Sequence, residues 1–512
     1  MNEAAAVPAT GTATVTPAVM PAVMPEASDR RCGSGKDTRP TVAENRHPGA
    51  RKTRRWARLG AWLKHHRRWI LTLQWAVVAF YAVLLLVPPL LPLPNHEARI
   101  LDHLTVFAEF VFWGIWWPFV MVSMVVAGRL WCGMMCPEGA ITEAASRVGM
   151  GRAIPRWMRW GGWPFVGFAM TTIYGQLVSV YQYPKAALLV LGGSTLAAAV
   201  IGLVYGKGKR VWCRHLCPVS GVFALLAKLA PLHYRADPEV WTEHGRRQRR
   251  REVSRSRAPD CPVLIPLKQL DSASDCHLCS RCSGYKDAIH LELRAPGIEV
   301  VSPPPQRPAT LWEFVLVVFG LLGIAVGAFH WSASPWFVAA KQQAAVWLYQ
   351  HGWGWPLETS APWWLLTHYP EHNDVFTLLD GALLLGYIGA TTLVLGGLVS
   401  LSLSLTNRLL GRWRWQRLWH LSYALIPLAA VGVFLGLSMT TLTLLRGDGL
   451  LIHWANDARA LLLGLGVLAS AGLGWGILGR YASGPRRLLA MLPMLAAQAP
   501  VIGAWWLLFW GW

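Results

Sequence analysis

Charged residues are scarce in this sequence, and acidic residues are the scarcer kind. Only 15% of its 512 residues are charged, with 27 Asp and Glu against 48 Lys and Arg, whereas 54% are hydrophobic. Several apolar runs of about 20 residues contain almost no charge, and that length is needed to cross the hydrocarbon core of a bilayer. The composition therefore excludes an ordinary water-soluble protein and indicates a polytopic membrane protein.

The excess of basic residues does not indicate a nucleic-acid partner, because of where these residues lie. They collect in the loops between apolar runs, and one group precedes the first run: Arg51, Lys52, Arg54, Arg55, Arg58, Lys64, Arg67 and Arg68. Basic residues on one side of the spans are typical of the cytoplasmic loops of inner-membrane proteins. We therefore expect a bacterial inner (plasma) membrane protein that contacts lipid and not nucleic acid. Its N-terminus should be cytoplasmic and its C-terminus periplasmic.

The apolar runs predict an all-α fold with about nine transmembrane helices. The expected spans are about 69–91, 106–127, 162–180, 186–205, 311–328, 376–403, 421–444, 460–478 and 488–510. Four domains follow from this pattern. They are a disordered basic cytoplasmic tail (1–68), a four-helix membrane repeat (69–231), a small cytoplasmic insertion (232–308) and a five-helix C-terminal membrane domain (309–512).

Cysteine is present in an ordinary amount, but it is unevenly spaced. Eight of the nine cysteines lie in three close groups, which favours metal ligation over disulfides. The ninth, Cys32, lies alone in the N-terminal tail and is interpreted as a spare thiol.

Two of the groups are copies of one motif. Cys132 and Cys136, and again Cys213 and Cys217, form C-x3-C-P sequences that follow an apolar run. Each copy has a Trp directly before its first cysteine and an Arg three residues before it, so the pattern is an internal repeat. If C-x3-C is helical, both sulfurs share one helix face and suit a soft metal centre. We expect both motifs at the cytoplasmic ends of their helices.

The third group has the spacing C-x2-C-x2-C at Cys276, Cys279 and Cys282, and Cys261 precedes it in the same insertion. Three thiolates at this spacing can bind three corners of an iron–sulfur cubane. Zinc is the alternative, but it usually takes two separated pairs of cysteines. The neighbouring His277 and His290 are expected at the surface and not as ligands.

A dinucleotide-binding fingerprint is missing, since no G-x-G-x-x-G stands between a strand and a helix. The protein is therefore expected to depend on redox partners and not to act as a self-sufficient reductase. It would be an electron carrier or a subunit of an oxidoreductase system.

Paired C-x3-C-P motifs followed by ferredoxin-type cysteines resemble the NapH/NosR/CcoG class of membrane polyferredoxins, over about residues 70–295. The resemblance implies [4Fe-4S] clusters and electron transfer at the inner membrane. Members usually carry two complete ferredoxin runs, whereas this chain has one, and Lys286 stands where its fourth cysteine should be. The missing ligand is then Cys261 or, alternatively, Cys136 or Cys217. The multi-span C-terminal part resembles polyferredoxins that accompany Ftr iron permeases.

Eight grouped thiolates allow two [4Fe-4S] clusters. In the preferred partition one cluster bridges the repeat and the other lies in the ferredoxin-like insertion. The first set is Cys132, Cys136, Cys213 and Cys217; the second is Cys261, Cys276, Cys279 and Cys282. A haem b held by His330 and His453, both expected near the outer surface, is a further prediction.

Three functions are compatible with these features. The favoured one is a relay that takes electrons from a cytoplasmic donor to a membrane or periplasmic redox partner, with a link to iron uptake. The second is an assembly factor that reduces or delivers a metal for a respiratory oxidase. The third is a redox-sensing transporter, although no pair of Gly/Pro-broken helices with intramembrane charges is present.

Overall fold

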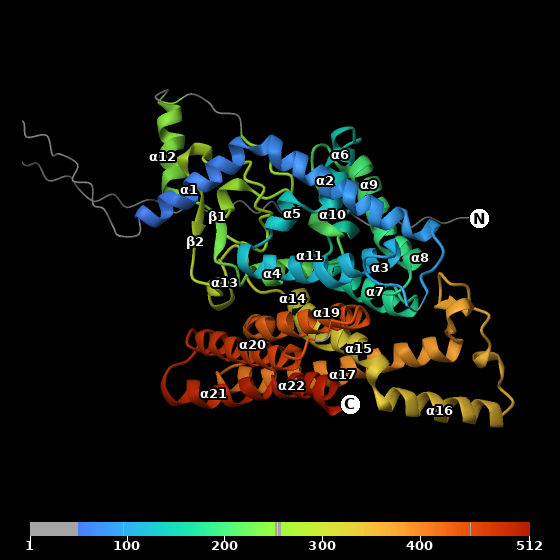
Figure 1. The fold of residues 1–512 in the computed structure, drawn as a ribbon. Coiled ribbons are helices and arrows are strands. Elements are labelled where there is room, and N and C mark those ends of the chain that lie inside the picture. The colour runs from blue at the N-terminus through green and yellow to red at the C-terminus, as the bar shows by residue number, and fades with distance from the viewer. Residues whose placement is uncertain (1–49, 96, 251–252, 254–257, 451) are drawn as a thin grey trace, which may run out of the picture. The chain divides into compact units, whose positions relative to one another are not determined.

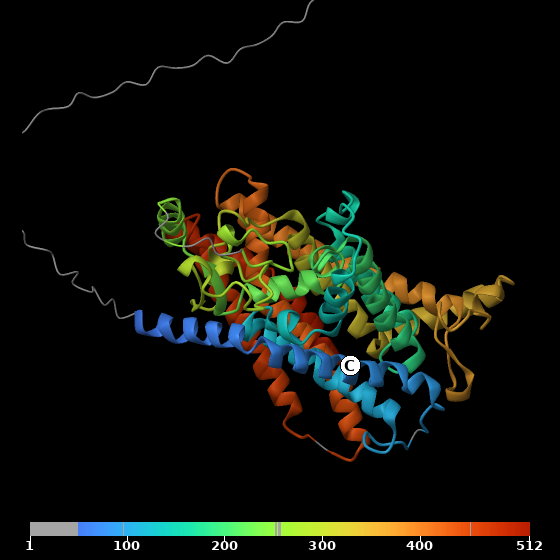
Figure 2. The ribbon, with the colours of Figure 1, turned by 90° about the horizontal axis from the view of Figure 1, so that it is seen from above.

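The computed structural model describes residues 50–95, 97–250, 253, 258–450 and 452–512. Most of the predicted tail, including Cys32, lies outside the described residues. The prediction of disorder is wrong for residues 50–65, which form helix α1 (Ala50–His65). This helix is ordered by packing, because Trp56 joins a small hydrophobic core in the insertion and Gly60 lies against Tyr234 and Ser283. Figures 1 and 2 show α1 leading directly into α2 (Arg67–Leu86), and Figure 1 shows a bend where the two helices meet.

Helices dominate the described chain, and eight of them are long and apolar enough to cross a membrane. These candidate spans are Arg67–Leu90, Leu104–Ala127, Pro184–Tyr205, Leu311–Ala333, Leu378–Leu409, Trp415–Gly447, Ala455–Leu478 and Gly484–Gly511. The third predicted span corresponds to α7 (Trp163–Leu177), which has 15 residues. The expected all-α membrane architecture is therefore confirmed.

Helix α7 runs beside the whole of the Leu311–Ala333 span, although it is shorter. At one end the rings of Trp160 and Trp312 lie 4.7 Å apart. At the other end the indole N–H of Trp331 donates to the side-chain oxygen of Gln176 over 2.9 Å. Because its two ends match the two ends of a full span, α7 covers the same depth as a membrane-crossing helix.

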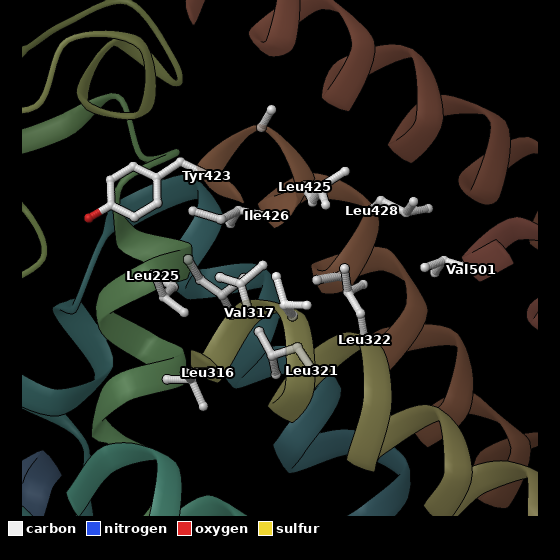
Figure 3. Packing of buried hydrophobic residues seen from close by; sticks show 14 of the residues in the cluster. Leu225, Leu316, Val317, Leu321, Leu322, Tyr423, Leu425, Ile426, Leu428 and Val501 are labelled. Atoms are coloured by element: carbon white, nitrogen blue, oxygen red, sulfur yellow. The ribbon is translucent and has the colours of Figure 1, made fainter. Parts of the chain in front are cut away.

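The Leu311–Ala333 span is the most buried of the candidate spans, with 72% of its apolar window inside the protein. Its residues Leu316, Val317, Leu321 and Leu322 pack against Leu225 and the segment from Tyr423 to Leu428 (Figure 3). This helix therefore joins the cysteine-bearing repeat to the C-terminal helices. In a bilayer such contacts are held by close packing, since lipid chains are as apolar as the side chains.

The repeat region consists of short helices, some of which are sections of the candidate spans and some of which connect them. They are α3 (Leu104–Glu109), α4 (Trp117–Ala127), α5 (Leu130–Met134), α6 (Pro137–Arg147), α8 (Pro184–Ala187), α9 (Gly193–Tyr205), α10 (Val211–His215) and α11 (Ser220–Ala227). The later helices are α13 (Ile298–Val301), α14 (Leu311–Val315), α15 (Ala325–His330), α16 (Pro335–Gln350), α17 (Leu378–Leu409), α18 (Trp415–Ser422), α19 (Ile426–Gly447), α20 (Ala455–Leu478), α21 (Gly484–Ala496) and α22 (Ala499–Trp506).

The insertion contains a two-stranded antiparallel sheet. Strand β1 (Leu232–Ala236) pairs with β2 (Ile289–Leu293) so that Tyr234 lies opposite Leu291. Helix α12 (Pro238–Arg249) follows β1, and the cysteine-rich loop leads into β2. A second pair, β3 (His368–Tyr369) with β4 (Asp374–Val375), lies in the long loop before α17. The β1–β2 pair therefore holds the two ends of the cysteine-rich loop together.

Candidate metal centres

Each C-x3-C-P motif is a break between two helices and not a single helical turn. Cys132 lies in α5, which ends at Met134, while Cys136 is the N-cap of α6 with an extended backbone at φ −61° and ψ 121°. The two cysteines therefore do not share one continuous helix, so the condition under which both sulfurs would lie on one helix face is not met. Pro137 explains the break, because a proline disfavours the helical conformation of the residue before it and is well placed at the first position of a helix.

The second motif repeats this arrangement with Cys213 in α10 and Cys217 just before Pro218. The backbone N–H of the second cysteine turns back to the tryptophan carbonyl in both copies: Cys136 to Trp131 over 2.9 Å and Cys217 to Trp212 over 3.0 Å. The same local hydrogen bond therefore holds the two cysteines of each motif near each other.

The first motif packs beside the middle of a candidate membrane span. Helix α6 packs antiparallel to α9, with Glu138 accepting a hydrogen bond from Ser194 over 2.6 Å and Met150 bonded to Leu203. Ser194 is near the middle of the Pro184–Tyr205 span, about 16 Å from its end at the usual helical rise. The motif follows the end of the Leu104–Ala127 span, as expected, but it packs beside the middle of the next candidate span because α6 turns back alongside α9. Its position on the cytoplasmic side stays a prediction.

The four cysteines of the repeat line one cavity of about 230 Å³. Cys132 and Cys213 are buried, and Cys136 and Cys217 are half-buried. Nine aromatic residues also line it: Tyr81, Trp113, Trp116, Trp117, Trp131, Phe168, Tyr181, Phe223 and Phe329. The structure thus places around one cavity the four thiols that the sequence groups in two distant pairs.

The arginine that precedes each motif connects it to the other motif. Arg210 donates to the carbonyl oxygen of Cys132 over 2.7 Å, and it also bonds to Glu143. Arg129 donates to the hydroxyl of Ser220 over 2.8 Å, and that hydroxyl donates to the carbonyl oxygen of Cys213. The sequence analysis noted both arginines but assigned them no role in connecting the motifs. The signal that could have pointed to this role is their common position, three residues before the first cysteine of each motif.

The four cysteines of the insertion line a second, smaller cavity. Cys261 is held there because Arg210 donates its backbone N–H to the Pro262 carbonyl over 2.7 Å. Leu278 and Ser280 have positive φ angles of 45° and 60°, which turn the short loops between the cysteines. Neither Cys136 nor Cys217 lines this cavity, so Cys261 is the cysteine that the structure places with the C-x2-C-x2-C run.

Lys286 stands in the sequence where a fourth cysteine ligand would be, but its side chain does not line the cysteine cavity. Its ammonium lies 4.4 Å from the centre of the Trp241 ring, away from the cysteine cavity. This cation–π contact stabilises the turn into β2.

Burial raises the pKa of the Cys276 thiol well above its ordinary value and that of Cys282 to about 12. Both thiols are therefore protonated at neutral pH without a metal, and binding a metal must release these protons.

The two cavities share a wall at His277, which lines both of them. This histidine is 3% exposed, so the expectation of a surface position is wrong. His290 is half-buried and bonds to the carbonyl oxygen of Asp287.

A β-carbon on Gly133 would lie 1.8 Å from the carbonyl oxygen of His277. Only a glycine at this position lets the first motif lie directly against the ferredoxin-type run.

The thiols suit a cluster better than a single metal ion. In the part of the chain that the structure describes, no three His, Cys, Asp or Glu side chains are close enough to hold one ion together. Mononuclear zinc requires such a close tetrahedral set. A cubane does not need such a set, because its four thiolate ligands are spread over its iron corners.

The predicted haem ligands have different surroundings. His330 is buried beside Trp505 and Trp512, with ring centres 5.8 and 5.4 Å away. His453 is exposed in the turn before α20. The bis-histidine haem stays a prediction without support from these contacts.

Comparison with known proteins identifies the chemistry of the repeat. Residues 110–159 and 189–235 each match the family model described as a 4Fe-4S binding domain. These two segments contain all four cysteines of the membrane cavity.

Two curated relatives support the same assignment. The chain is 30% identical over 120 residues to the methylamine utilization ferredoxin-type protein MauN of Methylorubrum extorquens. It is 25% identical over 118 residues to MauN of Paracoccus denitrificans. Each match covers 21% of this chain and 42% of the relative, so the chain spans less than half the length of the relatives it matches. No solved structure matches the chain.

These matches, with the apolar helices, support a polyferredoxin-like membrane protein that binds a [4Fe-4S] centre and transfers electrons. The narrower resemblance to the NapH/NosR/CcoG class and the link to iron permeases stay predictions.

Proposed function

We propose that this protein relays electrons through two [4Fe-4S] clusters at the inner membrane, from a cytoplasmic donor to a membrane or periplasmic redox partner. The ligands of the membrane cluster would be Cys132, Cys136, Cys213 and Cys217. Those of the insertion cluster would be Cys261, Cys276, Cys279 and Cys282. The observation that carries the proposal is the shared wall between two four-cysteine cavities.

Each cluster supplies reversible one-electron chemistry when bound. The chain would hold each cluster in place, keep water away from the membrane site and keep the two sites adjacent. Gly133 and the buried His277 form the contact between them. An electron that enters at the insertion could therefore reach the membrane site through a few atoms of protein.

The depth of the first motif supports a partner at or beyond the middle of the membrane. The hydrocarbon core is about 30 Å thick, and a centre at its cytoplasmic face would leave the whole of it to be crossed. Glu138 and Ser194 instead place the first motif beside the middle of a span. The remaining distance to a membrane or periplasmic partner is then about half of the core.

The proposal is tested on protein purified anaerobically, by iron and sulfide analysis and by electron paramagnetic resonance (EPR). We expect about eight iron atoms in two [4Fe-4S] clusters, because eight grouped thiolates allow two. Cys132→Ser and Cys213→Ser should remove the same signal, and Cys276→Ser should remove the other. Cys32→Ser is the control and should remove neither.

Stoichiometric zinc with little iron would contradict the proposal. Loss of different signals in Cys132→Ser and Cys213→Ser would show that each motif serves its own centre, which would overturn the shared membrane cluster.

The more specific role that we propose is reduction linked to iron uptake. The large C-terminal membrane part beyond the matched segments supports a function in addition to cluster binding. Uptake of radioactive iron by a deletion strain should fall and return with the wild-type gene but not with Cys132→Ser. Normal uptake with a lowered respiratory oxidase activity would favour an assembly factor instead.

A further inference from the structure

Arg129 is a buried cation in the wall of the membrane cavity. Its side chain is 5% exposed, and the residue lines the same cavity as the four cysteines of the repeat. The guanidinium donates to the backbone carbonyl of Ser274 over 3.0 Å and to the hydroxyl of Ser220 over 2.8 Å. Both partners are uncharged, and the Nε atom has no hydrogen-bond partner.

The second copy of the repeat provides an internal comparison. Arg210 occupies the equivalent position and is 1% exposed. It forms an ion pair of 2.8 Å with Glu143, which also pairs with Arg281. Among the ion pairs formed by the described residues, none includes Arg129. One arginine of the repeat therefore has a carboxylate counter-ion, and the other does not.

A buried charge without a counter-ion is strongly unfavourable, because burial removes its hydration without supplying an attraction. Such a cation persists where an anion is normally bound beside it. The one carboxylate that lines the cavity, Glu138, is bonded to Ser194 and Trp212. These two donors are uncharged and orient Glu138, and no ion pair joins it to Arg129 among the described residues. The four cysteines are a second source of negative charge in this cavity. An iron–sulfur cluster with four thiolate ligands is a net anion, and reduction makes it more negative.

We propose that Arg129 is the counter-ion of the membrane cluster and that it raises the reduction potential of this cluster. The inference rests on the proposed function, because it requires a cluster in the membrane cavity. Arg129 is a positioning residue and not a ligand. Its charge favours the reduced, more negative state, and its bond to Ser220 connects it to the backbone of Cys213.

The test compares Arg129→Gln and Arg129→Lys in the full chain that carries both clusters, by redox titration followed by EPR. Arg129→Gln should shift the midpoint potential of the membrane cluster to a lower value. The insertion cluster, whose cavity Arg129 does not line, should keep its potential. Arg129→Lys, which keeps the charge, should restore most of the shift. Arg486→Gln removes an equal charge from an exposed position and is the control.

Loss of the membrane signal in Arg129→Gln, with retention in Arg129→Lys, would also support the inference, because charge would then be needed to bind the cluster. An unchanged potential in Arg129→Gln, or equal loss of the signal in both variants, would overturn it while leaving the two-cluster relay intact. A wild-type protein without a membrane cluster would instead overturn the proposed function, and this inference with it.

Discussion

Gly133 is the residue at which the first motif and the ferredoxin-type run are closest. A β-carbon there would lie 1.8 Å from the His277 oxygen, 2.9 Å from its carbonyl carbon and 3.0 Å from the Cys279 nitrogen. All three are backbone atoms, so the contact cannot be relieved by turning a side chain. The separation of the two sites is therefore set by the absence of a side chain at one position.

We expect Gly133→Ala to push the insertion away from the membrane motif at a cost of at least about 1–3 kcal/mol, the usual range for overpacking. The melting temperature should fall, and magnetic coupling between the reduced clusters should weaken. Gly193→Ala is the matched control, since a β-carbon at Gly193 meets nothing within 4 Å. Unchanged coupling in Gly133→Ala would show that the clusters do not lie on either side of this contact.

Glu299 is the centre of a buried charge network between the insertion and the repeat. Arg294 lies 2.7 Å from one of its oxygens and Lys228 lies 3.8 Å from the other, and all three groups are largely buried. Although burial alone would raise the pKa of Glu299, Lys228 and Arg294 hold it below its ordinary value. The ionised form is therefore favoured by folding.

We expect Glu299→Gln to destabilise the protein by about 3–5 kcal/mol at pH 7, because it leaves the largely buried Arg294 without its carboxylate partner. Lys228, in contrast, keeps Glu313 at 3.3 Å. A lowered folded-state pKa gives stability that is present above the unfolded pKa of about 4.3 and is lost as the pH falls through the folded value. The difference in melting temperature from wild type should therefore shrink toward pH 4. The exposed Glu358→Gln is the control. A difference that grows on acidification would contradict this account.

Among the elements, α6 was the hardest to place from the sequence. Residues 137–147 are less apolar than a span, so hydropathy assigns them to none of the expected membrane helices. In the structure the helix packs along α9 at Gly202, where an added β-carbon would lie only 2.6 Å from the Thr142 carbonyl oxygen. Helix α1 is a similar case, because its order depends on contacts with the insertion.

The antiparallel packing of α6 on α9 predicts different water access for the two clusters. A paramagnetic relaxing agent confined to water should change the EPR saturation of the insertion cluster and have little effect on the membrane cluster. A lipid-soluble agent should act on the membrane cluster. Equal responses to the aqueous agent would show that the first motif lies at the membrane surface.

For the whole molecule, the crossing by α7 determines on which sides the termini lie. Eight crossings would put both ends on one side, whereas the contacts of Trp160 and Gln176 with the two ends of the Leu311–Ala333 span support a ninth. Loops rich in arginine favour the cytoplasm for the N-terminal side.

We therefore predict that the N-terminus is cytoplasmic and the C-terminus periplasmic. A phosphatase fused after Trp512 should be active, and a fluorescent protein fused at the same place should be dark in the periplasm. Fusions after Gly208, in the loop before the second motif, should give the opposite result and serve as the control. An inactive phosphatase at the C-terminus would indicate that the chain crosses the membrane eight times and not nine.

The sequence by itself determined the membrane class, the repeat and the eight thiols, because hydropathy and close cysteine spacing are local properties. Tertiary contacts alone decided which thiols share a cavity, how deep the first motif lies and why each motif is preceded by an arginine. The contact of Arg129 with Ser274 joins residues 145 positions apart, and that of Gly133 with His277 joins residues similarly distant. Such contacts depend on how the chain returns on itself. Local composition therefore could not reveal that one arginine has a carboxylate partner and the other faces the cysteines without one.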